Sequence, residues 1–233
     1  MHVHVSMGKE ADGTDITYST DQIRHILKQV VYFDAPLTKL MPPARKNNTW
    51  AESNVNYVTK WKNLHGKVPE ASWTPLFRSF DEAKTKDQLL RDLISTRCLS
   101  WNFKHILSKC GTVEFRRPPG VQTAQEAIKW TAFAIAYIAH AVWLQDWNRV
   151  RATKTYPSTN ELRAAIAAGL GKVGLDPQKI VGDLKDDEGK APDVSQEELA
   201  QANKEKRAKE QKKSIFVEKV QYTIYVSTSR NPS

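Results

Sequence analysis

Hydrophobic and polar residues alternate along three short stretches of the chain, with the two-residue period of a β-strand. The first is His-Val-His-Val-Ser at residues 2–6, in which the two histidines share one face of the strand. Residues 98–104 are aromatic and partly alternating, and residues 111–117 read Gly-Thr-Val-Glu-Phe-Arg-Arg before a closing Pro-Pro-Gly. We therefore expect an antiparallel sheet that contains these three segments.

Three longer stretches carry apolar residues at the 3.6-residue spacing of an α-helix. They are residues 20–40, 79–96 and 123–147, and a shorter helical stretch follows at residues 160–175. The whole pattern predicts the α+β class, with the helices packed on one face of the antiparallel sheet.

Local signals mark the starts of two of these helices. Ser19 or Thr20 is the expected N-cap of the first, and Thr123 with Glu126 three residues later gives the third a capping-box pattern. His140 is alone on an apolar helix face, so we expect a core histidine with a hydrogen-bond partner. The side chains that we expect to be buried in the second and third helices are Leu89, Leu90, Leu93, Trp130, Phe133, Ala134, Tyr137, Ala141 and Leu144.

Composition changes along the chain and predicts its organisation. We expect a globular half-domain at residues 1–157 and a short helical extension at residues 158–182. Large apolar residues nearly vanish after that, so residues 183–233 are expected to form a charged linker, an exposed helix and a tail, partly disordered. Residues 217–228 alternate again and favour an edge strand.

The overall composition is that of an ordinary soluble globular protein, with 40% hydrophobic and 26% charged residues among 233. Much of the net charge of +9 is concentrated in residues 204–213, where six basic residues face two acidic ones. Elsewhere the two signs are interleaved, so nucleic-acid binding is not favoured. The most apolar stretch, residues 130–144, is shorter than the ~20 residues of a membrane span, so we expect no membrane partner.

Cysteine usage points to a reducing compartment. Cys98 and Cys110 provide neither a disulfide framework nor the four ligands of a structural zinc site. No histidine signature accompanies either residue, so we expect buried thiols that are not nucleophiles, in a cytoplasmic protein.

Four motifs, taken in order, resemble the C-terminal half of one protein family. They are HVHVS at residues 2–6, PPARKNNTWAESN at 42–54, LSWNF at 99–103 and GTVEFRRPPG at 111–120, followed by a long tryptophan-containing helix. This series resembles the fungal amidoligases, which have the glutamine synthetase or carboxylate–amine ligase fold. The resemblance covers residues 1 to about 150 and implies an incomplete glutamine synthetase-like catalytic domain.

The resemblance also implies a function and a set of site residues. Enzymes of this family use Mg²⁺ and ATP to join a carboxylate to an amine through an acyl-phosphate. The resemblance implies that His2 and Glu114 hold a metal, that Glu114 and Arg116 are catalytic, and that Arg116, Arg45 and Ser6 bind the nucleotide phosphates. An amino acid or peptide substrate would lie against Asn48, Ser53, Asn54 and Asn102.

The local chemistry of the third strand agrees with this implication. Alternation places Glu114 and Arg116 on the same face, and a carboxylate for metal beside a guanidinium for phosphate suits phosphoryl transfer. Simpler interpretations remain open. Glu114 and Arg116 could form ordinary ion pairs between strands. The histidines at residues 2 and 4 could belong to a frayed terminus without a functional role.

The chain departs from the family at its start, where the family's first half supplies a Glu-x-Glu strand. A lone histidine and glutamate would bind magnesium weakly, because that ion prefers octahedral oxygen ligands. We expect Met1 to correspond to an internal position of a longer ancestral protein.

Two other functions therefore stay open. One is a catalytically inactive amidoligase-like domain that binds an amino acid, a peptide or a partner protein completing the site. The other is a tRNA-dependent peptide-bond former, for which the Asp-Asp-x-x-Glu motif of fungal arginine cyclodipeptide synthases is missing at Asp186 and Asp187.

Overall fold

The computed structural model describes residues 1–108 and 110–189, together with residues 197–198, 201–202, 204–205 and 208. The chain separates into two compact units, residues 1–192 and 193–233. All elements named below belong to the first unit. The edge strand expected at residues 217–228 lies outside the described residues.

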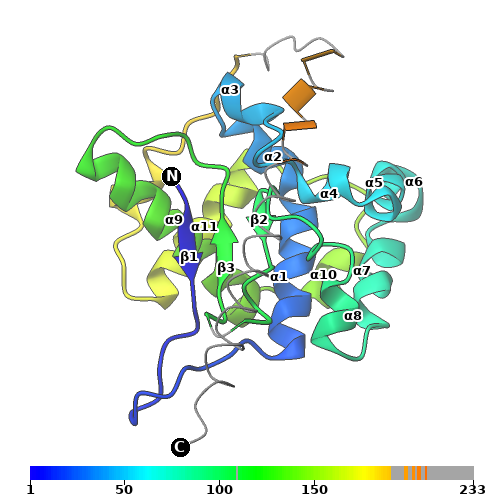
Figure 1. The fold of residues 1–233 in the computed structure, drawn as a ribbon, viewed down its shortest axis with the longest axis horizontal. Helices are drawn as coiled ribbons and strands as arrows, with labels where there is room; N and C mark the ends of the chain where they lie inside the picture. The colour runs from blue at the N-terminus through cyan, green and yellow to red at the C-terminus, as the bar shows by residue number, and fades with distance from the viewer. Residues whose placement is uncertain (109, 190–196, 199–200, 203, 206–207, 209–233) are drawn as a thin grey trace, which may run out of the picture. The chain divides into compact units, whose positions relative to one another are not determined.

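The first unit is of mixed α+β type, mostly helical, with one three-stranded antiparallel sheet in the order β1-β3-β2 (Figure 1). This confirms the predicted class and the three strand segments. The elements are β1 (Val3–Val5), α1 (Thr20–Tyr32), α2 (Asp34–Lys39), α3 (Pro43–Lys46), α4 (Asn54–Tyr57), α5 (Thr59–Gly66), α6 (Val68–Ala71), α7 (Thr74–Asp81), α8 (Lys86–Leu90), β2 (Trp101–Asn102), β3 (Val113–Phe115), α9 (Ala124–Trp143), α10 (Trp147–Arg151), α11 (Thr159–Lys172) and α12 (Gln178–Val181).

One face of the sheet is apolar and forms part of the core. Phe115 of β3 lies opposite Val3 on one side and Trp101 on the other. Its ring stacks at 4.3 Å on Trp101 and at 5.5 Å on Phe133 of α9, while Trp101 stacks at 4.5 Å on Tyr137. Helix α9 contacts both β1 and α1 and therefore lies in the core, behind the strands (Figure 1). The opposite face of the sheet is polar.

The predicted helix starts are confirmed. Ser19 caps α1 and forms a capping box with Gln22, and Thr123 does the same for α9 with Glu126. In each box the cap side chain accepts a hydrogen bond from the backbone of the third helical residue, which satisfies a donor that the first turn leaves free.

Three helix boundaries differ from the prediction. The stretch at residues 20–40 is two helices, because the chain leaves α1 at Phe33 before Pro36. Residues 79–96 are not one helix, since α7 ends at Asp81 and Thr85 caps the separate short helix α8. Helix α9 ends at Trp143, so Leu144 is 43% exposed instead of buried. The other side chains expected in the core of these two stretches are buried.

Helices α9 and α11 approach each other closely at Gly169. A Cβ atom at this position would overlap the backbone carbonyl of Ala136 in α9. Backbone cannot move aside as a flexible side chain does, so the absence of a side chain at Gly169 sets the distance between the two helices. Gly171, in the same helix, has no atom within 4 Å of the corresponding position.

We predict that Gly169→Ala lowers the free energy of unfolding by about 1–3 kcal/mol, the usual cost of overpacking. Gly171→Ala is the matched control and is expected to stabilise the protein by about 0.5–1 kcal/mol, since alanine is the better helix former. Urea denaturation of both variants checks this. Equal effects of the two substitutions would refute the close approach.

His140 is the satisfied core histidine that the sequence predicts. Its Nδ1 lies 2.8 Å from Oε1 of Gln29 in α1, and the Gln29 amide nitrogen donates to the backbone carbonyl of Tyr137. The Tyr137 hydroxyl in turn donates to the Gln29 carbonyl at 2.8 Å. Burial lowers the pKa of His140 from the ordinary 6.5 to about 4, because the charged ring would lose its hydration.

We predict that His140 contributes to acid sensitivity. Because folding lowers its pKa, the stabilisation is complete above about pH 6.5 and is lost as the pH falls towards 4, by up to about 3 kcal/mol. The free energy of unfolding of the variant His140→Gln should therefore fall less between these two pH values than that of the wild-type protein. Denaturant unfolding at a series of pH values measures this. His105→Gln is the control, and parallel curves for wild type and His140→Gln would contradict the prediction.

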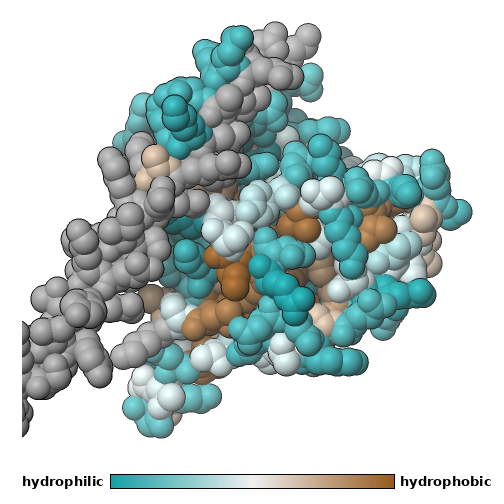
Figure 2. Space-filling view, turned by 45° about the vertical axis from the view of Figure 1, so that its right-hand side comes forward, coloured by the Kyte–Doolittle hydropathy of each residue, from teal (hydrophilic) through white to brown (hydrophobic). Residues whose placement is uncertain are grey.

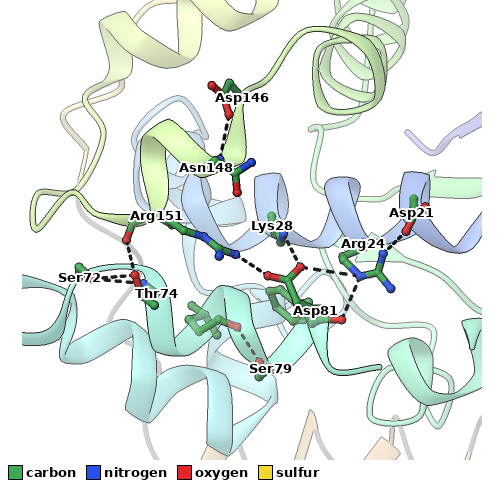
Figure 3. A network of polar contacts seen from close by, with 12 residues as sticks. Asp21, Arg24, Lys28, Ser72, Thr74, Ser79, Asp81, Asp146, Asn148 and Arg151 are labelled. Carbon is green, nitrogen blue, oxygen red and sulfur yellow. Dashed lines mark hydrogen bonds and ion pairs between the residues drawn. The ribbon is translucent and has the colours of Figure 1, made fainter. Parts of the chain in front are cut away.

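A cluster of ion pairs joins α1 to α7 and α10 around the carboxylate of Asp81 (Figure 3). Lys28 Nζ lies 2.6 Å from one oxygen and Arg151 Nη2 lies 2.5 Å from the other, while Arg24 Nε is 3.8 Å away. Partial burial opposes ionisation of Asp81, but the hydrogen bonds and charges of Lys28 and Arg151 outweigh it and lower its pKa. Three cations thus share one carboxylate.

The surface shown in Figure 2 is mostly hydrophilic, with small hydrophobic patches between hydrophilic residues. Within the described part of the chain, no helix has the length and hydropathy needed to cross a bilayer. Cys98 and Cys110 are not joined in a disulfide. Cys98 is buried as expected, whereas Cys110 is exposed because it lies in the turn before β3.

Candidate functional site

The polar face of the sheet carries one row of side chains across all three strands. Glu114 of β3 lies directly opposite His4 of β1 on one side and Asn102 of β2 on the other. The pleat places alternate residues on one face, so His2 and Arg116 join the same row. The motifs at residues 2–6, 99–103 and 111–120 therefore meet at one place.

Glu114 is the centre of this row and is only 3% exposed. Its Oε2 accepts a hydrogen bond of 2.6 Å from the Asn102 amide, and its Oε1 accepts one of 2.8 Å from Arg116 Nη1. His2 Nδ1 lies 3.0 Å and His4 Nε2 lies 3.6 Å from the same Oε1. Both carboxylate oxygens are therefore already engaged by nitrogen atoms.

The two histidines form the exposed rim of the site, with side chains 48% and 44% exposed. Burial and the positive charge of Arg116 lower the pKa of His2, and Glu114 opposes this effect. His4 has further neighbours, since its Nδ1 lies 3.1 Å from the Thr112 hydroxyl and its ring centroid lies 5.5 Å from that of His105. The strand start is thus held in place by specific contacts.

Three arginines gather at the end of β3. Arg45 donates to the backbone carbonyls of Arg116 and Arg117, at 2.5 Å and 3.0 Å. Burial and then the charges of Arg117 and Arg116 lower the pKa of Arg45. Arg117 is 1% exposed, and its nearest carboxylate is Asp34 at 3.8 Å. Among the described residues, Arg116 and Arg117 pair with the carboxylates of Glu114 and Asp34, whereas Arg45 bonds backbone carbonyls, so three guanidiniums are matched by two carboxylates.

The structure brings five of the predicted site residues to this region: His2, Glu114, Arg116, Asn102 and Arg45. The side chains of the remaining four are placed differently. Asn54 is fully buried, and its amide both donates to the backbone carbonyl of Trp101 and accepts from the backbone N–H of the same residue. Ser53 is the N-cap of α4, and its hydroxyl donates a hydrogen bond to Asp34. Asn48 bonds the backbone of its own turn, and Ser6 is exposed after β1.

The donor set does not fit magnesium. Among the described residues, no group of three or more His, Cys, Asp or Glu side chains could hold a metal ion. Both oxygens of Glu114 accept hydrogen bonds from N–H donors, and the guanidinium of Arg116 lies beside His2, at 3.5 Å from its Nδ1. Magnesium requires several oxygen ligands in near-octahedral geometry, and these residues do not supply them.

Three residues of the region were missed by sequence reasoning: Thr112, Asp34 and Arg117. Strand alternation puts Arg117 on the apolar face with Phe115. Because a buried charge needs a polar partner, an arginine at this position could have predicted one. Asp34 lies 83 positions earlier, so no local pattern connects the two residues.

Comparison with protein-family models, with curated proteins and with solved structures finds no match. The resemblance to the amidoligases therefore rests on the sequence motifs alone.

We predict that Glu114→Leu destabilises the protein by about 3 kcal/mol, because it leaves Arg116 and Asn102 without their acceptor in a buried place. The double variant Glu114→Leu/Arg116→Met should be less destabilised than Glu114→Leu alone, because it leaves no unpaired guanidinium. Denaturant unfolding measures both.

A matched surface pair provides the control. Lys9 and Asp15 form an ion pair with side chains 64% and 62% exposed, and Asp15→Ala should change stability by no more than about 0.5 kcal/mol. A double variant Glu114→Leu/Arg116→Met that is no more stable than Glu114→Leu alone would contradict the proposed pairing.

Proposed function

We propose that the polar face of the sheet binds a small anion, a carboxylate or phosphate group of a ligand such as an amino acid or peptide. On this proposal the chain acts as an amidoligase-like binding domain without magnesium chemistry. The observation that carries the proposal is the excess of guanidinium groups over carboxylates at the end of β3.

The available hydrogen-bond donors support an anionic ligand. Arg116 Nε is buried and has no hydrogen-bond partner among the described residues. Buried guanidinium N–H groups without acceptors are costly, and a carboxylate or phosphate supplies acceptors of matching geometry. The half-exposed His2 and His4 leave the face open on one side for such a ligand.

A ligase remains a second candidate because His2, Glu114 and Arg116 lie together as the resemblance implies. The missing oxygen ligands would then come from a partner protein or a further segment that completes the site. In that case Mg²⁺ and ATP would bind only to the completed assembly.

The proposal is tested by NMR titration of the protein with L-glutamate, inorganic phosphate and Mg-ATP. We expect glutamate or phosphate to shift the ring signals of His2 and His4 with millimolar affinity. The variant Arg45→Gln should weaken this binding about tenfold or more, equivalent to about 1.4 kcal/mol. Arg91→Gln, at an exposed arginine after α8, is the control.

Three outcomes are decisive. Binding that weakens about tenfold or more in Arg45→Gln and is unchanged in Arg91→Gln supports the binding site. No shift with any anion refutes it. Binding of Mg-ATP that requires the magnesium ion and is lost in Glu114→Gln would replace the proposal with the ligase.

A further inference from the structure

We infer that a cavity lined by residues of α1, α9, α10 and α11 binds a small zwitterion such as an α-amino acid. The cavity has a volume of about 440 Å³ and is lined by Tyr32, Phe33, His140, Gln145, Arg149 and Glu161, with small side chains between them. Its size is in the usual range for small-molecule sites. None of these residues belongs to the anion site on the sheet, so this inference does not rest on the proposed function.

The hydrogen bonding of His140 defines one side of this cavity. The Gln29 amide nitrogen faces the Tyr137 carbonyl, which only accepts hydrogen bonds, so Gln29 Oε1 is the atom that faces His140. Because Oε1 also only accepts, Nδ1 of His140 must carry the proton. The neutral ring then has its lone pair on Nε2, the nitrogen left for a ligand. His140 therefore offers a hydrogen-bond acceptor.

Glu161 and Tyr32 line the same cavity as His140. Oε2 of Glu161 accepts from the backbone and hydroxyl of Ser158, at 2.7 Å and 2.9 Å. Burial and the negative charge of Glu161 raise the pKa of Tyr32 to about 12, so the hydroxyl stays protonated. A neutral histidine, a carboxylate and a phenol together favour a ligand group that donates several hydrogen bonds and is positively charged, such as an ammonium group.

Arg149 of α10 supplies the opposite charge. Its side chain is exposed and lines the cavity, and it takes part in no ion pair within the described part of the chain. A guanidinium in this position matches a carboxylate, with two parallel hydrogen bonds. An arginine and a carboxylate in one cavity, each available to a ligand, match the two charges of a zwitterion.

A larger cavity, of about 620 Å³, lies beside α9 and α12, and Ile128, Ile135, Leu175 and Ile180 supply much of its lining. Asp176 and Lys179 also line it, but its lining contains neither a histidine nor an arginine. The inference is restricted to the cavity that contains His140, where the protonated Nδ1 leaves a defined acceptor.

The experiment is a titration of the full chain with each of the twenty standard L-amino acids, followed by ¹⁵N–¹H NMR of the histidine rings. We expect at least one amino acid to shift the His140 Nε2 signal with millimolar or tighter affinity. Arg149→Gln should weaken that binding about tenfold or more. Arg78→Gln, at an exposed arginine of α7, is the matched control and should leave it unchanged.

Further variants and probes keep the outcome clear. His140→Phe should abolish the binding, but this substitution also removes a core hydrogen bond. If the His140→Phe variant does not fold, the effect of Arg149→Gln on binding decides the test. Arg45→Gln separates this cavity from the anion site on the sheet and should have no effect here. If no amino acid shifts His140, or if the desamino acid of a bound amino acid binds equally well, the zwitterion site is refuted.

Discussion

The burial of one charge at the centre of a three-stranded sheet is the constraint on which the polar face depends. Glu114 is on the middle strand, and water reaches only 3% of it. A buried carboxylate costs several kcal/mol unless nearby donors compensate it. The compensation comes from all three strands, through Asn102 on one neighbour, His2 before the other, and Arg116 on the same strand. The charge thereby links the register of the strands to the arrangement of the site.

The same compensation limits what the site can do chemically. A carboxylate whose two oxygens already accept hydrogen bonds has little to offer a cation, and a guanidinium beside it repels one. Arg116 beside it is in the opposite situation, because its buried Nε–H lacks a hydrogen-bond acceptor among the described residues. The residue types of this site, a glutamate beside two histidines, are those of a metal site. Their hydrogen bonds nevertheless leave donors and not acceptors available, and this favours an anion. Residue types and spacing alone do not distinguish these two cases.

Features that depend on short-range geometry could be predicted from the sequence. Strand alternation put His2 and His4 on the face of Glu114, and capping boxes marked the starts of α1 and α9, because both follow from a few consecutive residues. Features set by distant partners could not. The break after Asp81 accompanies its ion pairs with Lys28 and Arg151, and Asn54 is tied to the backbone of Trp101, 47 residues away.

Tyr137 connects the layer beneath the sheet with the cavity around His140. Its ring stacks on Trp101 of β2, and its hydroxyl and carbonyl both bond to Gln29, which orients the histidine. A contiguous chain of contacts of this kind is necessary for coupling between two sites, but coupling also needs an element with two stable arrangements. Tyr137 and Gln29 are both fully buried and hydrogen-bonded to each other, and the structure shows one arrangement of them. These contacts therefore form a rigid scaffold that orients the two groups independently, and ligands at the sheet and in the cavity should bind without influencing each other.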